Sequence, residues 1–538
     1  MSFCDRQLDM KTPLAVTQCL DRARSIYGAS LGVVCGSTRL TYGEVAARVD
    51  RLSSGLTALG VKRGDVVACL SFNCHRLLEL YYAVPQMGAI LLPINIRLTP
   101  DDVAFIIEDS GAATVVIDRA LVGLFAPVRS RLAHVERIIL MGGEAKAQDA
   151  IDGDDYEMLV DDGAETFERP ALDEDAVAEL FYTSGTTSRP KGVMLTHRNL
   201  YMHAMSLIAA LHPTDADVQL HSIPLFHVNG WGTPHTITFV GGRHVMVPRF
   251  DPEVVLATIE RERVTQMLLV PTMAVALLNA PSAQTRDLSS MRRIKLGGAA
   301  SPPSLIAALD AWLPGCTITC GYGLTETTPV LTCGCVKAGL EGDPTRSVLL
   351  RSTAGIPIPG VEVEIIDEIG QPLPHDGVAV GEICARGNSI MAGYWKQPEE
   401  TARAFEGGWF HTGDVGAIDP NGYLYVVDRK KDIIITGGEN VASIEIENAL
   451  YTHPSVLECA VIAVPDPLWG EVPAALVVRK PNASADEAGL IAHCKSTLAG
   501  FKVPKRVRFV ETLPKGGTGK ILKRQLRDEY IRELTGAT

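Results

Sequence analysis

Strand-like and helix-like patterns alternate along the first half of this chain, and this alternation is what most constrains its fold. Residues 66–70 and 113–117 are short apolar runs typical of buried strands, whereas residues 42–59 and 75–86 repeat apolar side chains at helical spacing. The alternation then continues, with a predicted helix, strand, helix and strand at 200–211, 242–248, 252–262 and 266–270. Such an order with short connections predicts an α/β fold with largely parallel sheets.

The length of the chain predicts more than one domain. It has 538 residues, whereas single hydrophobic cores stop growing at roughly 250–300 residues. Its composition, with 46% hydrophobic and 21% charged residues, is typical of a globular protein. The net charge of −13 argues against non-specific binding of nucleic acid, so an anionic ligand would need local basic residues. We therefore expect small-molecule ligands and no nucleic-acid partner.

The pattern changes after residue 350. Residues 361–366 alternate at period two at first, and glycine-containing turns follow closely, which predicts a smaller β-rich subdomain. A dense charge cluster at 428–432 then separates two apolar strands, predicted at 423–427 and 433–435. We place a domain boundary in this cluster.

The two predicted domains are residues 1–430 and residues 431–538. The second mixes predicted strands, at 459–464 and 474–478, with helices, which indicates a compact α+β unit.

Several absences in the sequence predict a cytoplasmic protein. No secretory signal is visible at the N-terminus, and no apolar run approaches the roughly 18 residues of a membrane span. The 12 cysteines include no CxxC pair, so reduced thiols are expected. We expect no integral membrane segment.

Residues 182–193 crowd hydroxyls, glycines and one lysine into a turn-prone stretch that directly follows an apolar segment. Backbone N–H groups and hydroxyls can wrap a polyphosphate, and a lysine adds a point charge. The spacing from Gly185 to Lys191 equals that of a Walker A loop, but Pro190 and Gly192 replace its required residues. The stretch therefore predicts a nucleotide site without predicting a P-loop NTPase; a flexible surface loop is the alternative.

Two further segments carry glycines beside residues that could bind a nucleotide. In 321–327 an aromatic side chain lies between glycines and could stack on a purine, and Thr325 and Glu326 offer oxygen ligands for Mg²⁺. Residues 296–302 end a predicted strand in small residues that permit close approach of a flat ring.

The last two segments lie nearer the C-terminus. Residues 408–414 end in Asp414, which can accept both ribose hydroxyls, and Arg429 follows as a partner for a phosphate or ribose. Residues 514–520 present Lys520 on a glycine-rich strip.

Taken together, these segments resemble the adenylate-forming superfamily of acyl-CoA synthetases, luciferases and peptide-synthetase adenylation domains, with the motifs in the family's order over nearly the whole chain. The resemblance implies the family fold: a large N-terminal domain of two α/β subdomains plus a β-barrel, and a small mobile α+β C-terminal domain. It also implies an AMP-forming ligase, in which a carboxylate attacks ATP to give an acyl-adenylate and pyrophosphate, and the thiol of CoA then gives acyl-CoA and AMP.

The resemblance assigns roles residue by residue. The implied ATP and AMP ligands are Thr183, Ser184, Gly185, Thr186, Thr187, Lys191, Gly298, Ala299, Ala300, Gly321, Tyr322, Thr325, Asp414, Arg429 and Lys520. The implied catalytic residues are Lys520, Glu326, Thr325 and His227, with Glu326 and Thr183 at Mg²⁺ and Lys431 as the hinge. The implied CoA-binding residues are Gly437, Gly438, Glu439 and Trp469.

The stretch 221–232 is implied to line the acyl pocket. The implied acyl-binding residues are His227, Val228, Asn229, Gly230, Trp231 and Gly298. The stretch has no Asp or Glu to pair with an α-ammonium, which argues against an amino acid. Its Phe-His-Val-Asn-Gly-Trp run looks like the medium-chain fatty acyl-CoA ligase branch, which includes ligases for short thioether acids.

Three hypotheses remain. The favoured substrate is a medium-chain or short substituted fatty acid, such as a thioether acid. The alternatives are an aryl acid of the cinnamate or benzoate type, and a luciferase-like oxidoreductase or non-catalytic member of the fold. The oligomeric state stays open, with a homodimer as one option.

Overall fold

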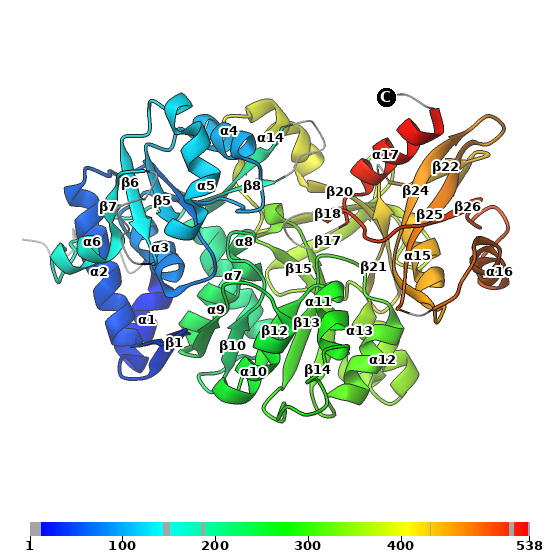
Figure 1. Ribbon diagram of the computed structural model, residues 1–538, viewed down its shortest axis with the longest axis horizontal. Coiled ribbons are helices and arrows are strands. Elements are labelled where there is room, and N and C mark those ends of the chain that lie inside the picture. Colours follow the sequence, from blue (N-terminus) through cyan, green and yellow to red (C-terminus); the bar gives the residue numbers. More distant parts are fainter. Residues whose placement is uncertain are drawn as a thin grey trace, which may run out of the picture.

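The computed structural model describes residues 12–143, 151–183, 189–430, 432–481, 483–515 and 521–535. Two large sheets form the main body of the protein, and two smaller sheets follow them along the chain (Figure 1). The predicted α/β class with largely parallel sheets is confirmed, since most strand pairs of the two large sheets are parallel.

The first large sheet has eight strands. They are β3 (Val66–Leu70), β4 (Ile90–Pro93), β5 (Thr114–Asp118), β6 (Arg137–Met141), β7 (Asp154–Asp155), β8 (Val177–Thr183), β9 (Lys191–Thr196) and β19 (Gly393–Tyr394). The strand order is β19-β9-β8-β4-β3-β5-β6-β7. Its helices are α2 (Tyr42–Ala58), α3 (His75–Gln86), α4 (Pro100–Ser110), α5 (Val122–Phe125) and α6 (Tyr156–Asp162).

The second large sheet has nine strands. They are β1 (Leu31–Cys35), β2 (Thr38–Thr41), β10 (Val218–His221), β11 (Arg243–Met246), β12 (Gln266–Leu269), β13 (Arg293–Leu296), β14 (Thr317–Gly323), β15 (Val330–Cys333) and β16 (Ile356–Pro357). The strand order is β16-β15-β14-β13-β12-β10-β11-β1-β2. The helices of this part are α1 (Gln18–Tyr27), α7 (His197–Leu211), α8 (Val228–Trp231), α9 (Thr233–Val240), α10 (Pro252–Glu262), α11 (Pro271–Leu278), α12 (Pro303–Trp312) and α13 (Pro344–Ser352).

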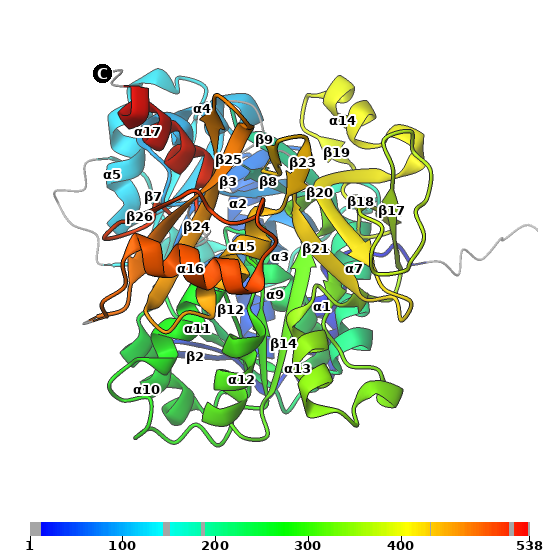
Figure 2. The same cartoon turned by 90° about the vertical axis from the view of Figure 1, so that its right-hand side faces the viewer.

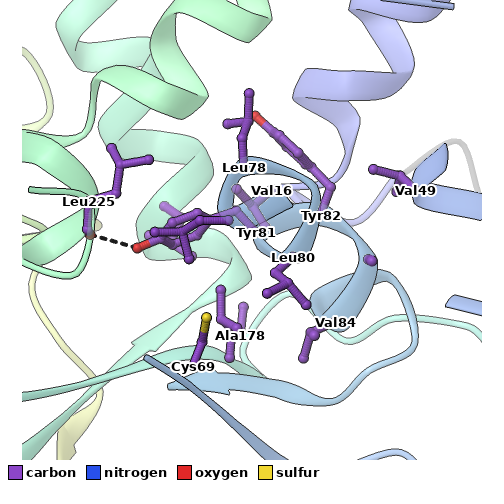
Figure 3. Packing of buried hydrophobic residues seen from close by; sticks show 14 of the residues in the cluster. Val16, Val49, Cys69, Leu78, Leu80, Tyr81, Tyr82, Val84, Ala178 and Leu225 are labelled. Carbon is purple, nitrogen blue, oxygen red and sulfur yellow. Dashed lines mark hydrogen bonds between the residues drawn. The ribbon is translucent and has the colours of Figure 1, made fainter. Parts of the chain in front are cut away.

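Helix α3 joins the cores of the two large sheets. Almost all of its side chains are buried, among them Tyr81 and Tyr82. The Tyr81 hydroxyl donates a hydrogen bond of 2.7 Å to the carbonyl of Leu225 (Figure 3). The Asn73 side chain, just before α3, donates to the carbonyls of His221 and Ile223 and accepts from Leu225 N. These contacts hold the segment that leads into α8.

The β-rich part predicted after residue 350 contains a four-stranded antiparallel sheet. Its strands are β17 (Val361–Ile366), β18 (Gly381–Gly387), β20 (Phe410–Ile418) and β21 (Leu424–Arg429), in that order. This sheet occupies the place of the expected β-barrel, and a bridge between Gly355 and Leu424 connects it to the region of β16. Helix α14 (Pro398–Ala404) lies beside β19.

The last sheet forms a small α+β unit. Its strands are β22 (Ile434–Thr436), β23 (Glu439–Val441), β24 (Val456–Asp466), β25 (Gly470–Arg479) and β26 (Arg506–Phe509), and its helices are α15 (Ser443–Tyr451), α16 (Glu487–Thr497) and α17 (Lys523–Thr535). One face packs against α15 and α16 and the other against α17, in cores whose buried members all follow residue 433. Figure 2 views the molecule from this side.

Two elements differ from the sequence prediction for identifiable reasons. Helix α7 begins at His197 rather than Leu200, because Thr196 and Asn199 form a capping box in which each side chain accepts from the other's backbone N–H. Strand β21 continues to Arg429, so Asp428 and Arg429 are strand residues rather than part of a connecting charge cluster. The second difference matters for the site.

Five short 3₁₀ segments complete the description: Arg119–Leu121, Ala126–Arg131, Thr325–Thr327, Ala338–Leu340 and Glu406–Gly408. Every cysteine in the described ranges is a free thiol. Within the same ranges, none of the helices combines the length and the apolar character that crossing a bilayer requires.

Candidate functional site

A cavity of about 2790 Å³ lies where the large sheets, the four-stranded sheet and the small C-terminal unit meet. The predicted site residues that line it are Thr183, Lys191, His227, Val228, Trp231, Gly298, Ala299, Ala300, Gly321, Tyr322, Thr325, Glu326, Asp414 and Arg429. These residues come from segments up to about 250 positions apart in the sequence, so the tertiary fold gathers them.

Some predicted residues lie outside the described residues: Ser184, Gly185, Thr186, Thr187, Lys431 and Lys520. The described residues that flank them do line the cavity. Thr183 and Arg189 flank the first gap, and Lys515 and Ile521 flank the last.

The predicted ribose-binding residues are adjacent. Asp414 and Arg429 are directly paired across β20 and β21, and Arg429 Nε lies 3.4 Å from Asp414 Oδ1. The Tyr322 hydroxyl donates to Asp414 Oδ2 over 2.7 Å. Asp414 is buried, and its two oxygens are thus held by two partners at the cavity wall.

The predicted metal-binding carboxylate, Glu326, lies in the 3₁₀ turn after β14. Burial raises the pKa of Glu326, and the Tyr394 hydroxyl donates to its Oε1 over 3.1 Å. Lys191 Nζ lies 5.1 Å from the centre of the Tyr394 ring and forms an ion pair with Glu400 of α14. The Tyr394 side chain therefore lies between the Glu326 carboxylate and the Lys191 ammonium group.

Mg²⁺ fits the residues at this place. Glu326 offers a carboxylate with one hydrogen-bond donor, and the Thr183 and Thr325 hydroxyls line the same cavity. Mg²⁺ is commonly bound through one or two carboxylates together with substrate phosphates.

The predicted acyl wall is a left-handed turn. Val228, Asn229, Gly230, Trp231 and Gly232 have φ values of 36°, 30°, 53°, 62° and 78°. This conformation costs L-residues roughly 1–2 kcal/mol each, so surrounding contacts must hold it. The short segment α8 is therefore not a regular right-handed helix.

Buried polar contacts hold the turn. The Asn229 side chain donates to Glu179 Oε2 over 2.9 Å and accepts from Gly232 N over 3.0 Å. His235 Nε2 lies 2.9 Å from the other oxygen of Glu179. Of the four residues of this turn that were predicted to bind the acyl group, Val228 and Trp231 line the cavity, whereas Asn229 and Gly230 do not.

Small residues at the end of β13 make room for Trp231. An ideal Cβ on Gly297 would lie 3.0 Å from Trp231 Cζ3, and one on Gly298 would lie 3.4 Å from Trp231 Cζ2. Gly298 also has a φ of 76°, which favours glycine. The indole and these glycines bound one side of an apolar slot that continues the cavity.

The predicted CoA-binding residues form one cluster outside the lining of the cavity. Gly437 and Gly438 make the two-residue turn between β22 and β23, both with positive φ, as hairpin turns of this length require. Gly437 N donates to the carbonyl of Trp469 over 2.8 Å. The Trp469 side chain is 48% exposed, and Glu439, which directly follows Gly438, is also exposed.

The sequence prediction missed four charged or hydroxyl side chains that line the cavity or contact its residues: Lys295, Tyr394, Glu400 and Lys523. Lys523 Nζ lies 2.8 Å from Glu447 Oε1 and donates a hydrogen bond to Ser443 Oγ. The backbone N–H and the hydroxyl of Ser443 in turn both donate to the Asp428 carboxylate. Lys295, which lies between the apolar residues Ile294 and Leu296, was the one signal in the sequence that could have been followed.

Buried histidines beneath the acyl wall predict an acid-sensitive fold. Burial lowers the pKa of His203 and of His221 to about 3; His203 faces His235 and Lys295, and His221 stacks on His244. The pKa of each histidine in the folded state lies below its usual value of about 6.5. The folded state therefore keeps its full stability above pH 6.5 and loses stability as the pH falls below it, because the unfolded chain then binds protons that the folded one does not. The free energy of unfolding should fall by about 1.4 kcal/mol per group for each pH unit below about 6.

Urea unfolding at pH 7.5 and 5.5 checks this expectation. His221→Asn should reduce the loss of stability on acidification, whereas His375→Gln, at an exposed histidine, should leave it unchanged. Equal pH dependence in both variants would contradict the assignment to buried histidines.

Comparison with known proteins follows the same division of the chain. The model of the AMP-binding enzyme family matches residues 21–395, and that of the AMP-binding enzyme C-terminal domain matches residues 445–520. The chain belongs to the AMP-binding enzyme family. The predicted membership in the adenylate-forming superfamily is thereby confirmed.

Members of the AMP-binding enzyme family that resemble this chain include CoA ligases for different acids. It is 38% identical to a long-chain-fatty-acid–CoA ligase of Thermus thermophilus, covering 96% of both chains. It is 36% identical to a 3-methylmercaptopropionyl-CoA ligase of Ruegeria lacuscaerulensis, covering 98% of this chain and 99% of that one. The crystal structure of the anthranilate CoA ligase AuaEII with anthranoyl-AMP has a TM-score of 0.88, with 26% identity over 98% of this chain and 99% of the other.

Proposed function

We propose that the protein is an AMP-forming acid–CoA ligase. The observation that carries this proposal is the common cavity, which combines the Asp414–Arg429–Tyr322 cluster and Glu326 with the apolar slot at Trp231. A ribose, a phosphate chain and an acyl chain can thus lie in one continuous space. The CoA ligases among the relatives support the same activity.

In the first half-reaction a carboxylate oxygen attacks the α-phosphorus of ATP in line, and pyrophosphate leaves. Asp414 would hold the ribose, and the adenine would lie against Tyr322 and the small residues Gly298, Ala299 and Ala300. Lys191 would leave its ion pair with Glu400 and bind the β- and γ-phosphates instead. His227 would orient the carboxylate. Positioning and charge neutralisation carry most of the rate in such a reaction.

We assign Mg²⁺ to Glu326, with Thr183 and the phosphates of ATP as further oxygen ligands. When bound, the metal would neutralise charge on the phosphate oxygens. The Tyr394 hydroxyl would keep the Glu326 carboxylate oriented toward them, because it is the donor to Oε1.

The second half-reaction requires a different arrangement of the C-terminal unit. The CoA-binding cluster of Gly437, Gly438, Glu439 and Trp469 lies outside the cavity lining, whereas Lys515 and Ile521, which flank Lys520, line it. We therefore propose domains 1–430 and 431–538, with rotation about Lys431 removing Lys520 and bringing the CoA cluster to the acyl-adenylate.

The proposed substrate is a medium-chain or short substituted fatty acid, such as a thioether acid, because the slot beside Trp231 is apolar on that side. An aryl acid is the second candidate, since the flat face of Trp231 and the glycines opposite it would also accept a ring. A homodimer and a cytoplasmic location remain predictions; light scattering and cell fractionation would check them.

The deciding experiment measures pyrophosphate release and CoA-thioester formation with matched fatty, thioether and aryl acids. We expect acid-dependent release of pyrophosphate, one thioester per AMP, and a larger kcat/KM with fatty or thioether acids than with aryl acids. Pyrophosphate release without consumption of CoA would contradict a CoA ligase and would favour the luciferase-like alternative. A preference for aryl acids would overturn the substrate assignment alone.

A further inference from the structure

Lys295 places a positive charge inside the wall of the cavity. It lies on β13, where Ile294 and Leu296 on either side of it face the hydrophobic core. Because side chains alternate along a strand, Lys295 faces the opposite side, where it lines the cavity. Its Nζ lies 3.2 Å from the Sγ of Cys333, which also lines the cavity.

Lys295 shares its face of the strand with Gly297, two residues further on. A Cβ on that glycine would lie 3.0 Å from the indole of Trp231, so Lys295 lies next to the acyl slot, about 6–7 Å back along β13. Val330 and Cys333 complete the lining in this direction. An acyl chain that passes Trp231 along this face would reach the ammonium group with its distal end.

Among the described residues, Lys295 forms no ion pair with a carboxylate, although it is half-buried. Its neighbour on the same face, Arg293, is paired with both oxygens of Asp217 over 3.1 Å. The other groups near Lys295 bring no negative charge: burial lowers the pKa of His203 to about 3, and its Nε2 accepts from Val330 N. Glu179, an acidic side chain behind the acyl wall, is held by His235 and Asn229.

A charge that is partly removed from water is usually paired, and here the open side of the ammonium faces a cavity that receives a ligand. We propose that Lys295 binds a second, distal carboxylate of the acid, so that among the substituted fatty acids the preferred substrates are dicarboxylic acids activated at one end. This inference rests on the proposed acid–CoA ligase function and names the substrate class of the same site.

The experiment compares acids of equal chain length that end in a methyl, a hydroxyl or a carboxylate group. For the wild type we expect kcat/KM to be about 10- to 100-fold higher for the dicarboxylic acid than for the monocarboxylic acid at the best length, as a charge-assisted hydrogen bond allows. The gain should lie in KM, because the distal group does not change during the reaction.

Substitution of Lys295 separates this role from a structural one. Lys295→Met should abolish the preference and improve the use of monocarboxylic acids, whereas Lys295→Arg should retain part of it. Lys337→Met, which removes a cation on the carbonyl of Asn421 outside the cavity lining, should leave the preference unchanged.

The two proposals fail in different ways. If no acid of any kind gives a CoA thioester, the ligase function is wrong. If monocarboxylic or hydroxy acids are used at least as well as dicarboxylic acids, or if Lys295→Met leaves the ratio unchanged, the ligase function stands and the role of Lys295 is overturned.

Discussion

Replacing Lys520 by alanine should lower the rate of acyl-adenylate formation by about 10²–10³-fold, the usual effect of removing a group that neutralises charge in the transition state. Lys520 itself lies outside the described residues, but its surroundings support the role. Lys515 and Ile521 pair in an antiparallel bridge, Leu522 N donates to the carbonyl of Pro514, and both ends of the strip line the cavity.

The measurement is acid-dependent exchange of labelled pyrophosphate into ATP, followed by CoA-thioester formation from supplied acyl-adenylate. The second reaction should change by no more than a few fold, because the proposed rotation removes Lys520 before the thiol attacks. Lys515→Ala is the matched control: it removes a lysine of the same strip that pairs with Glu458 over 2.6 Å, and exchange should persist. Wild-type exchange by Lys520→Ala would refute the assignment.

Replacing Asp414 by alanine should raise KM for ATP by about 10²-fold or more. The carboxylate would accept two ribose hydroxyls, and hydrogen bonds to a charged group contribute about 1.5–3 kcal/mol each. The substitution would also leave Arg429 and the Tyr322 hydroxyl without this partner, so the affinity for ATP should fall further. Tyr322→Phe, which keeps the carboxylate, should have a smaller effect of about ten-fold or less.

A comparison of ATP with 2′,3′-dideoxy-ATP identifies the contact. The wild type should bind the dideoxynucleotide much more weakly than ATP, whereas Asp414→Ala should hardly distinguish the two. If the variant keeps the full discrimination of the wild type, the ribose hydroxyls bind elsewhere and the assignment is wrong.

The fold was predictable to the extent that local patterns report it. The strand at 66–70 and the helices at 75–86 and 252–262 coincide with β3, α3 and α10, because each is a short periodic segment with its own boundaries. Positions set by side-chain capping or by pairing with another strand were less predictable. The start of α7 depends on Thr196 and Asn199, and the end of β21 depends on pairing with Asp414 across β20.

The candidate site was predictable where glycine, hydroxyl and charge patterns are contiguous, as at Tyr322 to Glu326 and at Asp414. It was not predictable where a residue acts through a partner that is remote in the sequence. Tyr394 and Glu400 contact Glu326 and Lys191 from positions 68 and 209 residues away, and neither stands in a motif of its own.

By itself the sequence determined that this chain forms an α/β enzyme of the AMP-binding family, since its motifs combine residue types that phosphates and ribose require. Only the tertiary structure decided how the part of the cavity that is proposed to bind the acid substrate is built. The left-handed turn that carries Trp231, and the position of Lys295 beside it without a carboxylate partner among the described residues, depend on contacts between strands and helices far apart in the sequence. Local patterns do not record such contacts, because burial and pairing exist only once the elements have packed together.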